Sequence, residues 1–197
     1  GTADRSQPPL GSYVVLKLFQ RLGDLEILRR AYPSLQRWHD FWTAPGPDGR
    51  ARRDGNGDGL LEWGSDAALV GKDLPSWERN ASGKMRACRE SGQEDLPNWD
   101  DASYSPETGT LTVNCLDLSS LYALDAWCLA EIARILGRPF DVDRYRVQYD
   151  RTKALINGRL WNEKSGVYFD RHWDGRFSVH KAASSFLPLL AGIATLL

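Results

Sequence analysis

The spacing of apolar residues predicts two helices at the start of the chain. Over residues 8–22 apolar side chains recur at helical intervals, and Gly23 follows as a stop signal. Asp24 is placed to cap a second helix that runs to about Trp42. Pro33 lies inside this second pattern, so we expect it to break or kink the helix.

The second half of the chain carries further helical patterns. Residues 115–137 have apolar positions on one side and end at a glycine, which predicts a strong helix. Asp141 is expected to cap the next helix, which reaches about Trp161. Residues 185–197 read as an apolar helix interrupted by Pro188.

A small hairpin is predicted over residues 166–179. Its strands, residues 167–169 and 177–179, are rich in aromatic and β-branched side chains and flank a Trp-Asp-Gly turn at residues 173–175. This hairpin is the one regular β element that the sequence predicts.

Residues 43–114 show almost no periodicity and are rich in glycine, proline, aspartate and asparagine. A loop region of this length inside a compact domain is uncommon, and such regions usually carry function. Antiparallel helix pairs with long loops on one side are typical of an α/α toroid or of a helical bundle.

Composition narrows the function classes. The chain has 197 residues, enough for one domain with a sizeable core. A net charge of −1 gives no indication of a nucleic-acid or anionic-membrane partner, and no run of about 18 apolar residues predicts a membrane span. No signal-peptide pattern opens the sequence, but the sequence also does not begin with Met. The sequence therefore does not indicate the cellular compartment. The three cysteines are expected to be buried free thiols: Cys88, Cys115 and Cys128. The three histidines are expected to be structural or surface residues: His39, His172 and His180.

The most informative segment for chemistry is Glu90–Asp95, in which Glu90, Glu94 and Asp95 surround a Ser-Gly pair. Aromatic residues flank this segment on both sides, among them Trp77 and Trp99. A carboxylic acid can protonate a leaving oxygen, and flat apolar walls can hold a sugar ring, so the combination favours glycoside cleavage. The same residues are also compatible with a helix-capping cluster or a solvated acidic loop.

A second acidic segment, residues 54–62, predicts a calcium loop. Oxygen-bearing side chains alternate along it, and a glycine occupies the sixth position, where a calcium loop turns sharply. The candidate ligands are Asp54, Asn56, Asp58, the backbone carbonyl of Leu60, and Glu62. Ser65 takes the twelfth position, where an EF-hand has a glutamate, so the segment is not an EF-hand. The alternative is a glycine-rich turn without a metal.

Several segments together resemble glycoside hydrolase family 63, a family of inverting α-glucosidase-like enzymes. They run in family order along nearly the whole chain: residues 5–9, 53–64, 90–95, 116–121, 130–137 and 186–192. The resemblance implies an all-α (α/α)6 toroid, here a partial barrel with long loops and a small β-hairpin. It also implies that residues 1–197 are one incomplete part of a single catalytic domain, and that the Asp54 loop can hold a structural Ca²⁺ ion.

The resemblance also implies roles for individual residues. The family motif reads Glu-Ser-Gly-x-Asp with the aspartate as general acid, and Glu94 stands at that position here. Glu carries the same chemistry on one more methylene group, and Asp95 is the alternative acid. Glu90 matches the leading glutamate, which implies a role in the sugar subsite or in tuning the acid. Gln7 matches a polar residue that reaches sugar hydroxyls. Three tryptophans are candidates either for sugar stacking or for the core: Trp63, Trp77 and Trp99.

An inverting hydrolase also needs a base that activates water. In the family this base comes from the second half of the barrel, so we expect the fragment alone to be inactive or very weak. The expected partners are an oligosaccharide or disaccharide substrate and the remainder of the protein's own catalytic domain, with no nucleic acid and no membrane.

Two groups of alternatives remain open on the sequence. One is another hydrolase on the same barrel, resembling trehalase, glucoamylase or mannosylglycerate hydrolase. The other is a non-catalytic, calcium-stabilised sugar-binding domain, which the glutamate at position 94 and the missing base both favour.

Overall fold

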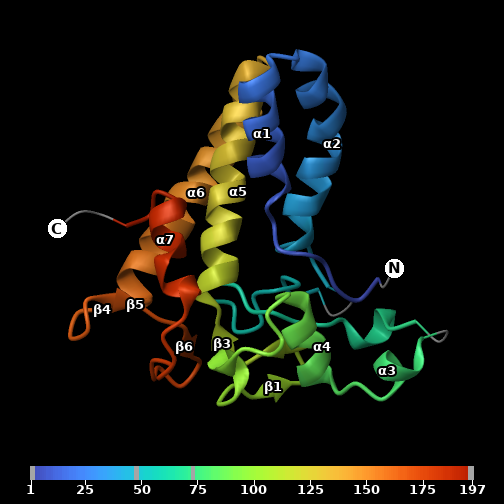
Figure 1. Ribbon diagram of the computed structural model, residues 1–197, viewed down its shortest axis with the longest axis vertical. Helices are drawn as coiled ribbons and strands as arrows, with labels where there is room; N and C mark the ends of the chain where they lie inside the picture. The colour runs from blue at the N-terminus through green and yellow to red at the C-terminus, as the bar shows by residue number, and fades with distance from the viewer. Residues whose placement is uncertain (1–2, 47–48, 72–73, 195–197) are drawn as a thin grey trace.

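The computed structural model describes residues 3–46, 49–71 and 74–194. Within these residues, four long helices run side by side as two antiparallel hairpins (Figure 1). They are α1 (Gly11–Leu22), α2 (Leu25–Phe41), α5 (Leu116–Ile135) and α6 (Pro139–Arg159). The helical pairs predicted from the apolar spacing are confirmed.

The turn between α1 and α2 follows the predicted capping signals. Gly23 adopts a left-handed conformation with φ 71°, and its N–H donates to the carbonyl of Phe19. The Asp24 side chain accepts a hydrogen bond from the N–H of Glu26 and so caps α2. Helix α2 continues through Pro33 to Phe41, so the predicted break does not occur.

Helix α5 is the centre of the helical layer. It is buried along most of its length, because α1, α2, α6 and α7 all pack against it. Helix α6 begins with Pro139 in its first turn, where the missing N–H costs nothing. The predicted cap at Asp141 is therefore wrong; this carboxylate lies inside the first turn and accepts a hydrogen bond from the Tyr32 hydroxyl at 2.9 Å.

A buried polar group ties three of these helices together. The imidazole of His39 lies 2.9 Å from Asp125 Oδ2, and the N–H of Ser12 donates to Asp125 Oδ1 at 3.2 Å. The His39 ring also stacks on Tyr122 at a centroid distance of 4.3 Å. His39 is thus a structural residue of the helical core, as the sequence predicted.

The region between α2 and α5 consists of short elements: η1 (Ala67–Leu69), α3 (Ser76–Arg79), α4 (Gly83–Glu90), η2 (Pro97–Trp99), β1 (Tyr104–Ser105), β2 (Thr110–Leu111) and β3 (Val113–Asn114). They lie at the end of the helical layer where α2 ends and α5 begins (Figure 1). Strands β1 and β2 pair antiparallel. The long loop region is therefore a folded layer beneath the helices.

The end of the chain adds β4 (Trp161–Asn162), β5 (Val167–Tyr168), β6 (Arg171–His172), η3 (Ala183–Phe186) and α7 (Leu187–Leu190). Strand β5 pairs with β4, and β6 pairs with β3, so the predicted pairing of residues 167–169 with 177–179 is wrong. A single bridge between Arg171 and Phe177 closes the predicted turn. Pro188 lies in the first turn of α7, which ends at Leu190, and residues 195–197 lie outside the described residues.

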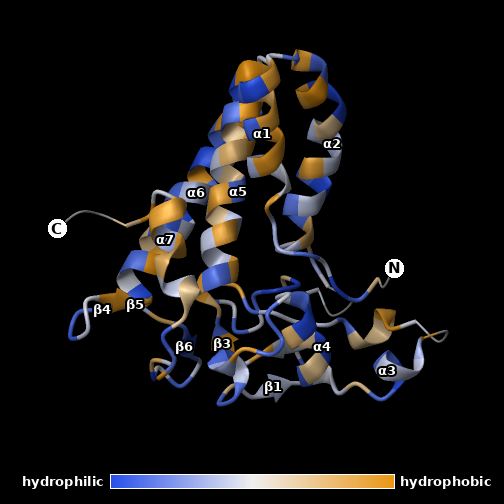
Figure 2. Ribbon diagram, in the orientation of Figure 1, coloured by the Kyte–Doolittle hydropathy of each residue, from blue (hydrophilic) through white to orange (hydrophobic). Residues whose placement is uncertain are grey.

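Two apolar clusters stabilise this arrangement among the described residues. The larger fills the space between α1, α2, α5 and α6, and the smaller lies in the layer of short elements around Trp42, Trp63 and Trp99. Hydrophobic colours gather on the helices in Figure 2, whereas the loops at their lower end are mainly hydrophilic or intermediate. In the described part of the chain, no helix is both long and apolar enough to cross a membrane.

Candidate active site

The Ser-Gly pair of the acidic segment ends helix α4. Ser91 Oγ donates to the carbonyl of Cys88 at 2.6 Å and accepts from the N–H of Gln93 at 2.9 Å. Gly92 adopts φ 66°, a left-handed conformation that favours glycine. The chain therefore leaves α4 in a tight turn that brings Glu94 and Asp95 to the surface.

Glu90 lies on the other side of this turn and is buried. Its Oε2 accepts from Arg53 Nε at 2.7 Å and from the N–H of Gly64 at 2.8 Å. Its Oε1 accepts from Arg53 Nη2 and from the N–H of Ser6, both at 2.8 Å. Bidentate pairs with arginine are among the strong hydrogen-bonded contacts of a carboxylate. Through these bonds Glu90 fastens three distant segments to the end of α4.

Glu78 forms a second buried centre of charge nearby. Three guanidinium groups surround it: Arg5 at 3.0 Å, Arg86 at 3.0 Å and Arg89 at 2.6 Å. Burial by itself would raise the pKa of Glu78, but the hydrogen bond from Arg86 and the contacts of Arg5 and Arg89 outweigh it and lower the pKa. Together with Glu90, this centre fixes the N-terminal segment against α3 and α4.

Glu94 and Asp95 are exposed, and neither side chain forms a hydrogen bond or ion pair within the described residues. Glu94 directly follows Gln93, whose carbonyl accepts from Trp99 Nε1 at 3.0 Å and from the N–H of Leu96 at 3.1 Å. The two carboxyl groups thus lie on a closed loop and are open to a ligand.

Gln7 is exposed and lies on the segment that Glu90 anchors through Ser6. Its backbone carbonyl accepts from Trp38 Nε1 at 3.2 Å. The structure therefore brings the N-terminal motif and the acidic motif to neighbouring positions, although more than 80 residues separate Ser6 from Glu90 (|i−j| = 84).

The three candidate tryptophans occupy different environments. Trp63 is fully buried and packs edge-on against Trp42 at 5.8 Å, and Trp99 is 3% exposed. Both belong to the smaller apolar cluster. Trp77 is 64% exposed, and the guanidinium of Arg89 lies 5.0 Å from its ring centroid. Of the three, Trp77 is the one whose ring is accessible to a sugar.

Two buried carboxylates, Asp117 and Asp170, contact residues on either side of Glu94 and Asp95. Asp117 Oδ1 accepts from the N–H of Leu118 at 2.7 Å and from Trp63 Nε1 at 3.0 Å, and its Oδ2 accepts from Gln93 Nε2 at 3.1 Å. Burial raises its pKa to about 6.

Asp170 follows β5 and is equally buried. Its Oδ1 accepts from the N–H of Leu116 at 2.7 Å, and its Oδ2 lies 3.5 Å from Asn98 Nδ2. Burial, and next the charge of Asp117, raise the pKa of Asp170 to about 7. Sequence reasoning did not single out either aspartate as a site residue. Asp117 lies in one of the segments on which the family resemblance rests, but no sequence signal marks Asp170.

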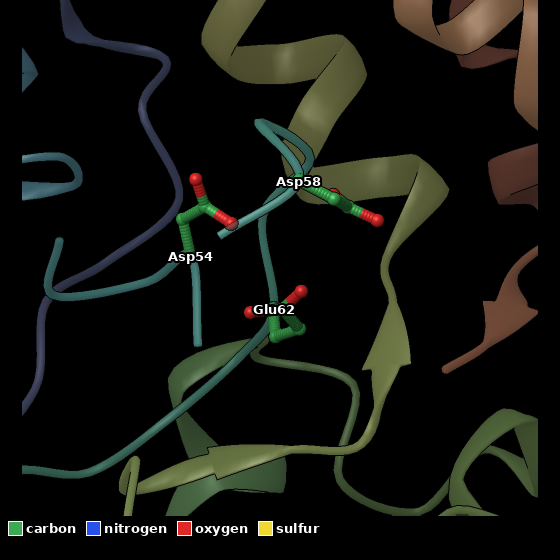
Figure 3. Close-up of side chains that lie close together, drawn as sticks. All are labelled: Asp54, Asp58 and Glu62. Atoms are coloured by element: carbon green, nitrogen blue, oxygen red, sulfur yellow. The ribbon is translucent and has the colours of Figure 1, made fainter. Parts of the chain in front are cut away.

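The predicted calcium loop brings three carboxylates together. Oxygens of Asp54, Asp58 and Glu62 all lie within 4.8 Å of one another (Figure 3). Glu62 is fully buried, and its Oε2 accepts from the N–H of Gly55 at 2.7 Å. Burial, followed by the charges of Asp54 and Asp58, raises the pKa of Glu62 well above its ordinary value despite that hydrogen bond.

The other candidate ligands are already partly engaged. Asp58 accepts from the N–H of Leu60 at 2.9 Å and forms an ion pair with Arg159 at 2.7 Å. Asn56 Oδ1 accepts from the N–H of Asp58 at 3.1 Å. Asp54 Oδ1 is buried and has no hydrogen-bond partner among the described residues, and burial raises the pKa of this carboxyl. An unpaired buried oxygen beside two further carboxylates fits a hard cation.

Comparison with known proteins is consistent with this geometry. The family described as "Mannosylglycerate hydrolase MGH1-like glycoside hydrolase domain" matches residues 1–196. Among curated proteins, a probable trehalase from Oryza sativa subsp. japonica is 25% identical over 94% of the chain and 38% of its own length. Trehalase from Oryctolagus cuniculus is 27% identical over 95% of the chain and 35% of its own length.

Solved structures share the fold. The glycoside hydrolase family 63 mannosylglycerate hydrolase from Thermus thermophilus, in complex with glucose, matches 99% of the chain and 49% of its own length, with 19% identity and a TM-score of 0.69. Neutral trehalase from Saccharomyces cerevisiae matches 97% of the chain and 42% of its own length, with 19% identity and a TM-score of 0.73. The chain thus spans half or less of these relatives, and the predicted all-α (α/α)6 class is confirmed.

Proposed function

The chain belongs to the mannosylglycerate hydrolase MGH1-like glycoside hydrolase domain family, and from that membership we propose that it is part of an inverting glycosidase that cleaves a small α-linked glycoside. One observation carries the proposal beyond family membership. The exposed Glu94 lies on a turn held by hydrogen bonds of Ser91 and Gln93. Ser6, the neighbour of Gln7, bonds to Glu90 at the start of the same motif. This supports an accessible acid on one segment and a polar side chain for sugar hydroxyls on the segment joined to it.

In the proposed reaction the Glu94 carboxylic acid gives its proton to the glycosidic oxygen as the bond to the anomeric carbon breaks. A water molecule attacks that carbon from the opposite face, and a carboxylate base takes the water's proton. An inverting pair of carboxyl groups is separated by roughly 6.5–9.5 Å to leave room for the water. We assign the base to the remainder of the catalytic domain, as the family resemblance implies.

Asp95 is the alternative acid, since it is also exposed. Glu90 is a poor candidate for proton transfer, because Arg53 and two backbone N–H groups already occupy both of its oxygens. We propose that Glu90 acts by fixing the loop and the N-terminal segment. For sugar stacking the exposed ring of Trp77 is better placed than the buried rings of Trp63 and Trp99.

The substrate is proposed at the level of its class. The family description names mannosylglycerate hydrolase and the curated relatives are trehalases, so a disaccharide or a sugar linked to a small polar acid is favoured over a long polymer. An α-glucosidase acting on oligosaccharides is the broader form of the same proposal. The second candidate, a non-catalytic sugar-binding domain, is favoured by the glutamate at position 94, because the longer side chain displaces the acid.

We propose a structural Ca²⁺ ion at the Asp54 loop. Asp54, Asp58 and Glu62 would hold it, with Asn56 and the Leu60 carbonyl as the further ligands expected from the sequence. Burial raises the pKa values of Asp54 and Glu62, and a bound cation would offset that effect and stiffen the loop next to Arg53.

The test uses the complete gene product with trehalose, maltose and mannosylglycerate, following the product anomer by proton NMR. We expect release of the inverted sugar, and loss of at least about 100-fold in kcat for Glu94→Gln, since general acid catalysis contributes about 10²–10⁴-fold. Glu94→Asp and Asp95→Asn are the matched controls. Full activity in Glu94→Gln with loss in Asp95→Asn would move the acid to Asp95. Sugar binding without turnover in the unmodified protein would establish the binding domain instead.

A further inference from the structure

Two carboxylates that are not part of the proposed chemistry lie directly beneath residues 91–99, which we call the acidic loop. Asp117 and Asp170 are 2% and 3% exposed and meet at the first turn of α5. Asp170 accepts from the N–H of Leu116 and Asp117 accepts from the N–H of Leu118, so both use N–H groups that a helix leaves unpaired. Negative charge at this end of a 20-residue helix is also favoured by the helix dipole.

Each carboxylate makes one further bond to the acidic loop. Asp117 accepts from the Gln93 side chain, and Asp170 faces the Asn98 side chain. Gln93 and Asn98 stand on either side of Glu94 and Asp95, whose side chains have no hydrogen bond or ion pair of their own within the described residues. The two exposed carboxyl groups therefore lie between two residues whose side chains contact the buried aspartates.

We propose that Asp117 and Asp170 are positioning residues that act through Gln93 and Asn98 to place the Glu94 carboxyl against the glycosidic oxygen. The inference rests on the proposed role of Glu94 as the acid. In this proposal the core helix α5, rather than the loop itself, determines where the Glu94 carboxyl group lies.

The electrostatics of the pair support this role. Two buried carboxylates that repel each other retain a proton near neutral pH, consistent with pKa values of about 6 and about 7. Asn98 Oδ1 is buried and has no hydrogen-bond partner among the described residues. A protonated Asp170 can donate to this oxygen once the amide is turned, which would complete the second anchor. The charge of His172 acts in the opposite direction and lowers the pKa of Asp170.

The test replaces Asp117 by alanine in the complete gene product, because a turned Gln93 amide can still bond to an asparagine at this position. Alanine offers no acceptor to Gln93 Nε2, so this anchor of the loop is lost. We expect kcat to fall roughly 10- to 100-fold with KM little changed, because a misplacement of about 1 Å can cost about 10²-fold. Hydrogen–deuterium exchange over residues 91–99 should become faster. Gln93→Leu removes the same hydrogen bond without touching α5 and should reproduce both effects.

The matched control is Asp125→Ala, since Asp125 is a buried carboxylate on the same helix and bonds to His39 and Ser12. It should lower the melting temperature while leaving kcat and loop exchange unchanged. Unchanged loop exchange in both Asp117→Ala and Gln93→Leu would overturn the anchoring, whether or not the protein is a hydrolase. Faster exchange with unchanged kcat would overturn the catalytic positioning. An unmodified protein without hydrolytic activity would overturn the proposed function, and the exchange result would still decide the anchoring.

Discussion

The Arg53 guanidinium and the Glu90 carboxylate form a fully buried bidentate pair, with Nε–Oε2 and Nη2–Oε1 distances of 2.7 and 2.8 Å. Arg53 precedes the predicted calcium loop, and Glu90 opens the acidic motif. The pair therefore joins the two segments that the sequence marks as functional. The same guanidinium also donates to Asp66 Oδ1 at 2.9 Å and to the carbonyls of Asp4 and Arg52, each at 3.0 Å, so all of its N–H groups form hydrogen bonds.

Removing one partner of this pair should be strongly destabilising. In Arg53→Ala the Glu90 carboxylate stays buried without its counter-charge, and we expect a loss of about 3–5 kcal/mol in the free energy of unfolding. Urea denaturation measures the loss. The control is Arg146→Ala, which removes a half-exposed ion pair with Glu131 at 3.7 Å and should cost less than about 1 kcal/mol. Equal losses in the two variants would contradict the role assigned to the pair.

Two glycines should respond oppositely to the same substitution. A Cβ atom on Gly64 would lie 2.6 Å from the Gly109 carbonyl oxygen, and backbone cannot move aside cheaply. Gly64→Ala should therefore destabilise the protein by about 1–3 kcal/mol. Gly158 lies inside α6 with nothing within 4 Å of the place that an added methyl group would take, so Gly158→Ala should stabilise by about 0.4–1 kcal/mol. Thermal unfolding of both variants tests the packing. A stabilised Gly64→Ala would refute the close approach of Gly64 to the Gly109 carbonyl.

The buried aspartate pair should make stability depend on pH. Because the folded pKa values of Asp117 and Asp170 are raised from 3.8 to about 6 and about 7, the folded state binds more protons than the unfolded state in this range. The contribution of the pair to the free energy of unfolding is therefore fully present below about pH 4 and is lost as pH rises to about 7. Urea denaturation between pH 5 and 8, in the absence of divalent cations, should show this decline superimposed on other titrations.

Asp170→Asn provides the check on that assignment. It removes the higher of the two pKa values and the repulsion on Asp117, so the decline between about pH 5 and 8 should become shallower. Asp174→Asn, on an exposed turn, is the control and should leave the slope as it is. A decline of unchanged slope in Asp170→Asn would show that other groups cause it.

Calcium should stabilise the protein through the Asp54 loop. A ligand present at about 100 times its dissociation constant adds about 2.7 kcal/mol to the free energy of unfolding. The melting temperature should rise with Ca²⁺, fall with EDTA, and stop responding in Glu62→Gln, in which a buried anionic ligand is lost. Glu107→Gln, an exposed carboxylate outside the cluster, should respond like the unmodified protein. A calcium response that persists in Glu62→Gln would place the ion elsewhere.

The helices of this protein follow from local signals in its sequence. The apolar spacing, Gly23 and Asp24 define the turn between α1 and α2, because capping is settled by neighbouring backbone groups. The predicted cap at Asp141 is wrong, but a different local rule explains where α6 begins. Pro139 lies in its first turn, where proline is favoured. The segment Glu90–Asp95 was likewise singled out from sequence alone.

What each carboxylate does was decided only by the tertiary structure. Glu90 and Glu94 are alike in sequence, yet Glu90 is occupied by an arginine 37 residues away, whereas Glu94 stays accessible. Asp170 became part of the site because it meets the first turn of α5, 54 residues earlier in the chain. Burial and charge pairing depend on such long-range contacts, and no local pattern records them. For the same reason the predicted partner of residues 167–169 was wrong and strand β6 was not predicted, since short strands take their pairing from the surface on which they pack.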